Sequence, residues 1–178
     1  RLPFELTAGQ REVLDVISVD LESTRPMNRM LQGEVGSGKT IVSVLAMLQM
    51  IDAGYQCALL APTEVLAAQH ARSVRDTLGT LAMAGELGAD DRATAVALLT
   101  GSMTAAQKRQ VREEVASGRA GIVIGTHALL QEAVEFECLG MVVVDEQHRF
   151  GVEQRDTLRA KAPEGLTPHL LVMTATPI

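Results

Sequence analysis

Short apolar runs alternate along this chain with segments whose apolar residues recur every three or four positions. The runs have the length and unbroken apolar character of buried strands, and they lie at 56–61, 96–100, 121–125, 141–144 and 169–173. A further short strand is predicted at 28–32, and helical spacing predicts helices at 7–23, 41–53, 63–78, 105–117, 126–131 and 151–162. Alternating strands and helices predict an α/β fold with a mostly parallel central sheet and helices on both faces.

Length and composition fit one domain. A chain of 178 residues with 47% hydrophobic content can bury a substantial core. Residues 79–95 are small or acidic and show weak periodicity, so we expect an exposed loop there. Because the sequence lacks an initiator methionine and stops at Ile178 directly after an apolar strand, we expect residues 1–178 to be one domain of a longer, multi-domain protein.

Charge and composition narrow the class of partner. The net charge of −6 and the 2% aromatic content argue against gripping nucleic acid through a bulk positive field or base stacking. No apolar run approaches the ~20 residues that span a bilayer, and the N-terminus lacks the layout of a signal peptide. We therefore expect a cytoplasmic protein with no membrane partner. Cys57 and Cys138 lack metal-ligand spacing, which predicts reduced core thiols.

A phosphate-binding loop is the strongest chemical signal in the chain. Residues 33–40 fit the pattern G-x-x-x-x-G-K-[ST], and the candidate nucleotide-binding residues within it are Gly33, Gly36, Ser37, Gly38, Lys39 and Thr40. The glycines let backbone N–H groups wrap a triphosphate, Lys39 can reach its β- and γ-phosphates, and the Thr40 hydroxyl can bind Mg²⁺. The predicted strand before the loop and helix after it favour this function over a plain glycine-rich turn.

Polar residues follow the predicted strands at their carboxyl ends, where parallel sheets place their ligands. Asp145 and Glu146 come directly after a buried strand. Asp145 can hold Mg²⁺ through water, and Glu146 can polarise the water that attacks the γ-phosphate. Together with the phosphate loop, this pair favours ATP hydrolysis. Gln147 and His148 could sense the γ-phosphate or could cap the next turn.

The four residues at 145–148 spell a DExH-type box, which together with the phosphate loop resembles the first motor domain of superfamily 2 helicases. The block at 145–155 and the motifs at 26–29, 61–64, 125–129 and 173–177 resemble more specifically the RecG family of branched-DNA translocases. This resemblance covers almost the whole chain, from Leu2 to Ile178. Transcription-repair coupling factors are the nearest relatives, but they usually carry other residues where Ser37 and Gln147 stand.

The resemblance implies a RecA-like P-loop domain that binds ATP and Mg²⁺. Phe4 and Gln10 match a motif that recognises adenine, whereas spacing alone favours a helix-capping role for Gln10. Lys39 and Thr40 match the phosphate and Mg²⁺ contacts. Asp145 and Glu146 match the metal-holding acid and the catalytic base.

The same resemblance implies a DNA side and a link between the two sides. Five positions match motifs that contact the phosphodiester backbone of one DNA strand: Thr63, Thr100, Gly101, Thr126 and His127. Hydroxyl and N–H groups at helix starts suit that contact without a large net charge. Thr174 and Thr176 match the motif that couples hydrolysis to DNA movement, and His148 and Arg149 match the box that links nucleotide state to the DNA side.

The predicted function is the ATP-binding and hydrolysing half of a double-stranded DNA translocase that remodels stalled forks and Holliday-type junctions in repair and recombination. We expect branched or double-stranded DNA as the partner, a monomer, and association with the nucleoid. The family's wedge domain and second motor domain are not in this sequence. The alternatives are a coupling-factor-like translocase, a non-helicase P-loop ATPase and a non-catalytic nucleotide-binding module.

Overall fold

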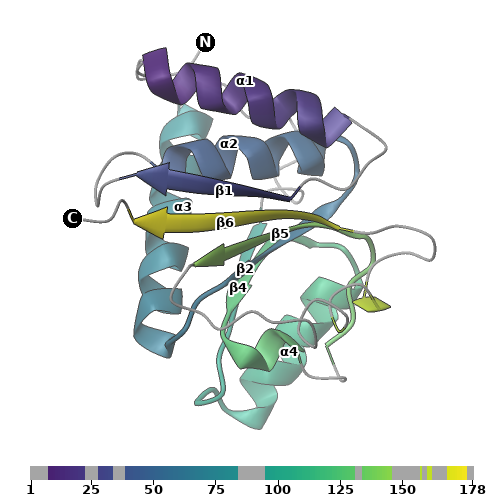
Figure 1. Cartoon of the computed structure of the whole chain (residues 1–178). Helices are drawn as coiled ribbons and strands as arrows, with labels where there is room; N and C mark the ends of the chain where they lie inside the picture. The colour runs from purple at the N-terminus through teal and green to yellow at the C-terminus, as the bar shows by residue number, and fades with distance from the viewer. Residues whose placement is uncertain are drawn as a thin grey trace.

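Within the described residues, which are 8–22, 28–33, 39–83, 95–130, 134–145, 157, 160–161 and 168–175, six strands form one sheet in this computed structural model. The strands are β1 Asn28–Gly33, β2 Gln56–Leu60, β3 Ala95–Leu99, β4 Ala120–Gly125, β5 Leu139–Asp145 and β6 His169–Ala175. They lie in the order β1-β6-β5-β2-β4-β3, and every neighbouring pair is parallel. The arrowheads of β1, β6 and β5 accordingly point the same way in Figure 1.

Helices cover both faces of this sheet. They are α1 Ala8–Glu22, α2 Lys39–Asp52, α3 Glu64–Met83, α4 Ala105–Ala116 and the short 3-10 helix η2 His127–Leu130. Successive residues of a strand point to opposite faces. Cys57 and Leu59 therefore pack with α2 and α3, whereas Ala58 and Leu60 pack with α4 and η2. With α1 lying against α2 (Figure 1), the predicted α/β class with helices on both faces is confirmed.

The helix α2, which follows the phosphate loop, is buried as its apolar spacing predicted. Met47 is 1% exposed. The helix ends in a Schellman motif, in which the Tyr55 N–H donates to the Met50 carbonyl at 3.0 Å and the Gly54 N–H donates to the Ile51 carbonyl at 2.9 Å. Gly54 has a φ of +94°, a conformation that glycine adopts at little cost. Gly54 therefore caps the C-terminus of α2.

The helix α4 begins with a capping box. The Thr104 hydroxyl oxygen accepts from the Gln107 N–H at 3.1 Å, and the Gln107 side chain accepts from the Thr104 N–H at 3.0 Å. Gly118 ends the helix, with a φ of +81° and an N–H that donates to the Val115 carbonyl at 3.2 Å. This helix connects β3 to β4, which are neighbours in the sheet.

The prediction of a loop over 79–95 is wrong at both of its ends. α3 continues through Met83, and Ala95 already belongs to β3. The residues at 80–83 include the good helix formers leucine, alanine and methionine, and one glycine in a helix interior costs only about 1 kcal/mol. A small-residue composition therefore did not break the helix. Residues 84–94 lie outside the described residues.

Two predicted helix features are only partly within the described chain. The predicted helix at 151–162 is represented by Thr157, Ala160 and Lys161, all of which are helical, and its other residues lie outside the described part. The predicted helix at 7–23 is described over Ala8–Glu22, and its residues 7 and 23 lie outside the described part.

Both cysteines are free thiols in different surroundings. Cys57 is fully buried, and burial raises the pKa of its thiol well above the usual range. Cys138 is only partly buried; burial and then the nearby Glu137 carboxylate raise the pKa of its thiol. The core location predicted for Cys57 is confirmed, whereas the one predicted for Cys138 is wrong because that residue precedes β5 rather than lying in it.

No helix among the described ranges is long and apolar enough to cross a membrane.

Gln56 joins four segments through one buried amide. Its Nε2 donates to the carbonyls of Val115 and Ala120 at 2.8 and 2.9 Å, and its Oε1 accepts from the Cys138 N–H at 2.9 Å. Gln56 is 4% exposed. These three hydrogen bonds tie β2 to the end of α4, the start of β4 and the segment before β5. Loss of the side chain would leave buried backbone groups without a partner, which costs their full desolvation free energy.

Replacing Gln56 by leucine is expected to lower the free energy of unfolding of the chain by about 2–4 kcal/mol, because buried backbone groups lose their partners. Urea denaturation measures this loss. Gln49→Leu is the matched control, since its half-buried amide makes one described bond, to the Ser18 carbonyl at 3.1 Å. The control should cost about 1 kcal/mol or less. Equal losses in the two variants would contradict the structural role of Gln56.

Candidate functional site

The strand order separates the predicted site residues into two groups along one edge of the sheet. All strands are parallel, so their carboxyl ends share that edge. The neighbouring strands β1, β6 and β5 end at Gly33, Ala175 and Asp145, which belong to or adjoin the predicted nucleotide and coupling motifs. The strands β2, β4 and β3 lead into the predicted DNA-contacting positions, which are Thr63, Thr126, His127, Thr100 and Gly101. We call the first group the nucleotide half and the second group the DNA half, after their predicted roles.

The nucleotide half is assembled from β1, β6, β5 and the start of α2. Gly33 lies opposite Ala175 in the parallel pairing of β1 and β6, and Asp145 lies opposite Met173 in the pairing of β5 and β6. Lys39 and Thr40 are the first residues of α2. They therefore lie at the positive end of a helix, which favours a bound phosphate.

A buried contact ties α2 to β6 in this half. The Ser43 hydroxyl donates to the Met173 sulfur, with 3.2 Å between Oγ and Sδ, and both residues are buried. Ser43 lies one turn after the start of α2, and Met173 lies directly before Thr174. This hydrogen bond therefore joins the phosphate-loop helix to the strand that carries the predicted coupling threonine.

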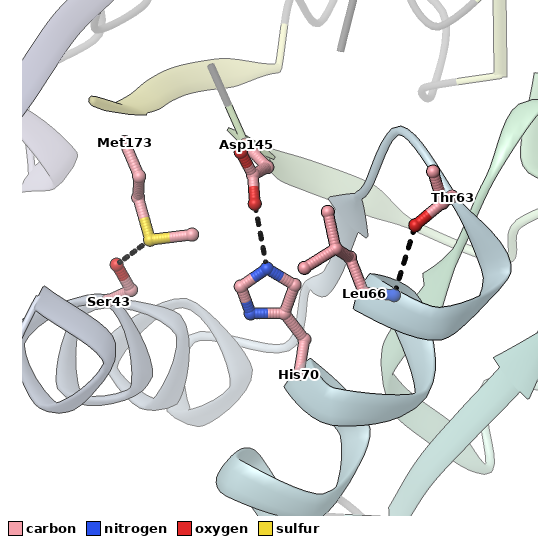
Figure 2. Close-up of polar contacts among 6 residues, drawn as sticks. All are labelled: Ser43, Thr63, Leu66, His70, Asp145 and Met173. Carbon is pink, nitrogen blue, oxygen red and sulfur yellow. Dashed lines mark hydrogen bonds and ion pairs between the residues drawn. The ribbon is translucent and has the colours of Figure 1, made fainter. Parts of the chain in front are cut away.

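Of the two predicted site carboxylates, Asp145 lies within the described residues. It is the last residue of β5, with a side chain 18% exposed. Its Oδ2 lies 3.0 Å from Nε2 of His70, a residue of α3 whose side chain is 17% exposed. Figure 2 shows the imidazole pointing from α3 straight at the carboxylate, beside the Ser43–Met173 contact. The predicted metal-holding acid therefore has a histidine partner from the other half of the edge.

Sequence reasoning missed His70, although a signal was present. Leu66, Ala67, Ala71 and Val74 keep helical spacing and form the stripe of α3 that faces the sheet. His70 falls on the same stripe, where an apolar residue is the usual occupant. A titratable residue on a helix face that packs on the sheet needs a polar partner. The polar residues of this sheet lie at the ends of its strands, so a contact there was the expected one.

The DNA half begins at Thr63, which caps α3. Its Oγ1 accepts from the Leu66 N–H at 3.2 Å, as Figure 2 shows, and the residue is exposed. A hydroxyl that accepts at a helix cap keeps its own hydrogen to donate, so Thr63 can still donate to a phosphate. The adjacent Glu64 accepts from the Ser102 N–H at 2.8 Å and holds the turn after β3 against the start of α3.

Thr100 and Thr126 are buried, whereas a hydroxyl that contacts a DNA phosphate must be exposed. They are 6% and 9% exposed, whereas Gly101 between β3 and α4 is exposed. The Thr126 carbonyl accepts from the Leu129 N–H at 3.0 Å and so closes the turn of η2. The Thr100 N–H donates to the Met103 sulfur at 3.3 Å and the Ser102 N–H donates to Glu64. The exposed Gly101 therefore fits the predicted DNA contact better than the two buried threonines do. The DNA-binding roles of these positions stay predictions.

The remaining predicted residues are placed only in part. Gln10 lies in α1, His127 opens η2, and Thr174 lies in β6. The other predicted residues lie outside the described residues, and they are Phe4, Gly36, Ser37, Gly38, Glu146, Gln147, His148, Arg149 and Thr176. Their roles stay predictions from the sequence.

Gly125 sets the spacing between β4 and β3 at the DNA half. A Cβ at this position would lie 2.2 Å from the Leu99 carbonyl oxygen and 2.9 Å from the Leu129 side chain. Gly125→Ala is therefore expected to lower the free energy of unfolding by about 1–3 kcal/mol. Gly79→Ala is the matched control: nothing lies within 4 Å of its Cβ, so alanine in the helix should stabilise by about 0.5–1 kcal/mol. Urea denaturation of both variants checks this prediction, and a stabilised Gly125→Ala chain would contradict it.

Comparison with known proteins shows the family to which this chain belongs. The model of the DEAD/DEAH box helicase family matches residues 7–178. The chain therefore belongs to the DEAD/DEAH box helicases.

Two relatives and two solved structures refine this placement. ATP-dependent DNA helicase RecG of Mycobacterium tuberculosis is 82% identical over 178 residues, which are 100% of this chain and 24% of that protein. RecG of Aquifex aeolicus is 49% identical over 178 residues, which are 100% of this chain and 21% of that protein. A structure of RecG bound to a three-way DNA junction has a TM-score of 0.78 and 42% identity over 99% of this chain and 22% of its own. The resemblance to the RecG family is confirmed, and this chain spans about a quarter of those curated relatives.

The second structure shows the fold alone. The DEAD-box helicase Mss116, bound to single-stranded RNA and UDP-BeF, has a TM-score of 0.67 at 20% identity and covers 97% of this chain and 36% of its own. Together with the RecG structure, it confirms the predicted RecA-like arrangement of the sheet and its helices.

Proposed function

We propose that this chain is the ATP-binding and hydrolysing half of a DNA translocase that remodels forked and four-way DNA. The parent protein, meaning the longer protein that we propose carries it, would supply a wedge domain and a second motor domain. The observation that carries the proposal is the two-part edge, in which the phosphate-loop helix and Asp145 adjoin a row of helix starts and turns suited to a nucleic-acid backbone.

The nucleotide half has the chemistry for Mg²⁺-ATP. Lys39 and Thr40 at the start of α2 combine a cation, a hydroxyl and the N–H groups of a helix end. Oxygen ligands suit Mg²⁺, and the carboxylate of Asp145 with the hydroxyl of Thr40 provides such a set. Mg²⁺ would neutralise charge on the β- and γ-phosphates. Glu146 is proposed as the base that orients the attacking water, next to Asp145 in the chain.

The DNA half suits contacts to the phosphodiester backbone of DNA that do not depend on the base sequence. The exposed Thr63 at the start of α3 and the exposed Gly101 present a hydroxyl and backbone N–H groups. Such contacts bind phosphates without base preference, as a translocase requires. They also fit an acidic chain, because the net charge of −6 leaves no bulk positive field to attract DNA. The RecG structure bound to a three-way DNA junction supports branched DNA as the substrate class.

Turnover of ATP by the parent protein on three DNAs tests this function. We expect forked DNA to stimulate turnover more than linear duplex or single-stranded DNA, and Lys39→Ala to remove turnover on all three. Stimulation that depends on RNA polymerase would favour a coupling-factor-like translocase instead. Turnover that no DNA changes would favour a non-helicase P-loop ATPase.

A further inference from the structure

The helix α3 runs from the DNA half of the edge to the nucleotide half. Its N-cap is Thr63, at the proposed DNA backbone contact. His70, about two turns further along the same helix, contacts Asp145 at the end of β5. Figure 2 shows Thr63 at the start of α3 and His70 further along the helix, with the imidazole directed at the carboxylate. One rigid element therefore contacts both halves.

The direction of the His70–Asp145 hydrogen bond follows from the acceptor. A carboxylate that serves a metal is ionised and can only accept hydrogen bonds. The Nε2 of His70, 3.0 Å from Oδ2 of Asp145, therefore carries the hydrogen and donates it. A carboxylate has about four lone-pair sites, so a bond to one oxygen is compatible with a metal-bound water at the carboxylate as well.

The surroundings of the imidazole are mostly apolar, which strengthens this bond. A small cavity adjoins the ring, and its lining comes from α2, β2, α3 and β6: Ser43, Val44, Met47, Leu59, His70, Val74 and Met173. Most of these side chains are apolar, and a hydrogen bond beside apolar groups is stronger than one in water. The ring shares this cavity with side chains of α2 and β6, while its Nε2 lies 3.0 Å from Oδ2 of Asp145.

We propose that His70 is a positioning residue that orients the Asp145 carboxylate for Mg²⁺-nucleotide and links it to α3. The proposal rests on the proposed function, because it assigns Asp145 the metal-holding role. Partners that orient a metal-holding carboxylate commonly matter about 10–100-fold for metal affinity or activity. His70 neither contacts the nucleotide nor transfers a proton in this role. Its effect passes through the orientation of Asp145 alone.

Three substitutions separate hydrogen bonding from packing. His70→Gln keeps an N–H donor at about the distance of Nε2, His70→Asn keeps a polar amide that is too short to reach Asp145, and His70→Leu keeps bulk without a donor. Gln69→Leu is the control, since it adds the same apolar side chain at the exposed neighbouring position of α3. Thermal unfolding of each variant shows whether it folds, and His70→Gln is the variant least disturbing to the core.

The experiment measures binding of a fluorescent, non-hydrolysable ATP analogue to the parent protein as Mg²⁺ is titrated. We expect His70→Leu and His70→Asn to raise the Mg²⁺ concentration for half-maximal binding by about tenfold, at the low end of the range for such partners. His70→Gln should stay within about threefold of the unmodified protein, and Gln69→Leu should match it. When Mg²⁺ is omitted and the analogue binds through the phosphate loop alone, its Kd should be nearly the same for all variants.

Two outcomes would overturn the proposed role of His70 alone, and a third would overturn the proposed nucleotide site as well. Folded His70→Leu with an unchanged Mg²⁺ dependence would show that His70 only packs. His70→Gln as impaired as His70→Leu would show that the hydrogen bond is not the cause. Absence of Mg²⁺-dependent analogue binding in the unmodified protein, or equal binding by Lys39→Ala, would overturn the proposed nucleotide site itself and thereby the role of His70.

Discussion

The 178-residue chain alone is expected to hydrolyse ATP about 10³ to 10⁵ times more slowly than the parent protein bound to forked DNA. Hydrolysis spreads negative charge over the γ-phosphoryl oxygens, and arginines from a facing domain contribute about that factor in related ATPases and GTPases. The family resemblance assigns those arginines to a second motor domain outside this sequence. Lys39 and Asp145 supply only one side of the proposed site.

Steady-state phosphate release by the purified chain, with and without forked DNA, measures this difference. Lys39→Ala in the chain provides the background, because any contaminating ATPase survives that substitution. Binding of a fluorescent ATP analogue confirms that the slow chain still folds and holds nucleotide. Rapid turnover by the chain that needs neither DNA nor another domain would contradict the division of the site between two motor domains.

Glu146→Gln in the parent protein is expected to lower fork-stimulated turnover by about 10² to 10⁴, the usual contribution of a positioned general base. Glutamine has nearly the same shape but cannot accept the proton of the attacking water. Nucleotide binding should persist, because the phosphate loop and Asp145 are unchanged. This pairing of lost turnover with retained binding distinguishes a base from a residue that holds nucleotide.

Single-turnover hydrolysis and analogue binding measure the two effects separately. Glu137→Gln is the matched control, since Glu137 is an exposed carboxylate on the segment before β5. It should leave both quantities unchanged. Full turnover by Glu146→Gln would instead support a nucleotide-binding module whose hydrolysis does not depend on this residue.

The elements were predictable because the buried strands carry an unusually clear signal. β2, β4 and β5 are covered on both faces, so their sequences are continuous apolar runs that no exposed strand would tolerate. α2 likewise shows its buried stripe in the spacing of its apolar residues. The loop predicted at 79–95 is wrong at its start because residues 80–83 include good helix formers, and α3 continues through Met83.

The arrangement of the site could be predicted only in part. Polar residues after parallel strands must share an edge, so Gly33, Asp145 and Thr126 were expected together. The order β1-β6-β5-β2-β4-β3 depends on which strands pair, and no local pattern encodes that choice. Without it, the separation into a nucleotide half and a DNA half stays hidden. The His70–Asp145 contact has the same origin, because it joins residues 75 positions apart.

Conversion of a model stalled fork into a four-way junction by the parent protein tests the proposed function most directly. The fork carries labelled nascent strands, and gel electrophoresis follows their annealing to each other. We expect conversion that requires Mg²⁺ and ATP hydrolysis, fails with a non-hydrolysable analogue, and is lost in Lys39→Ala while the fork is still bound. A fork that stays intact in the presence of ATP, Mg²⁺ and an actively hydrolysing protein would contradict the proposal that this chain powers a branched-DNA translocase.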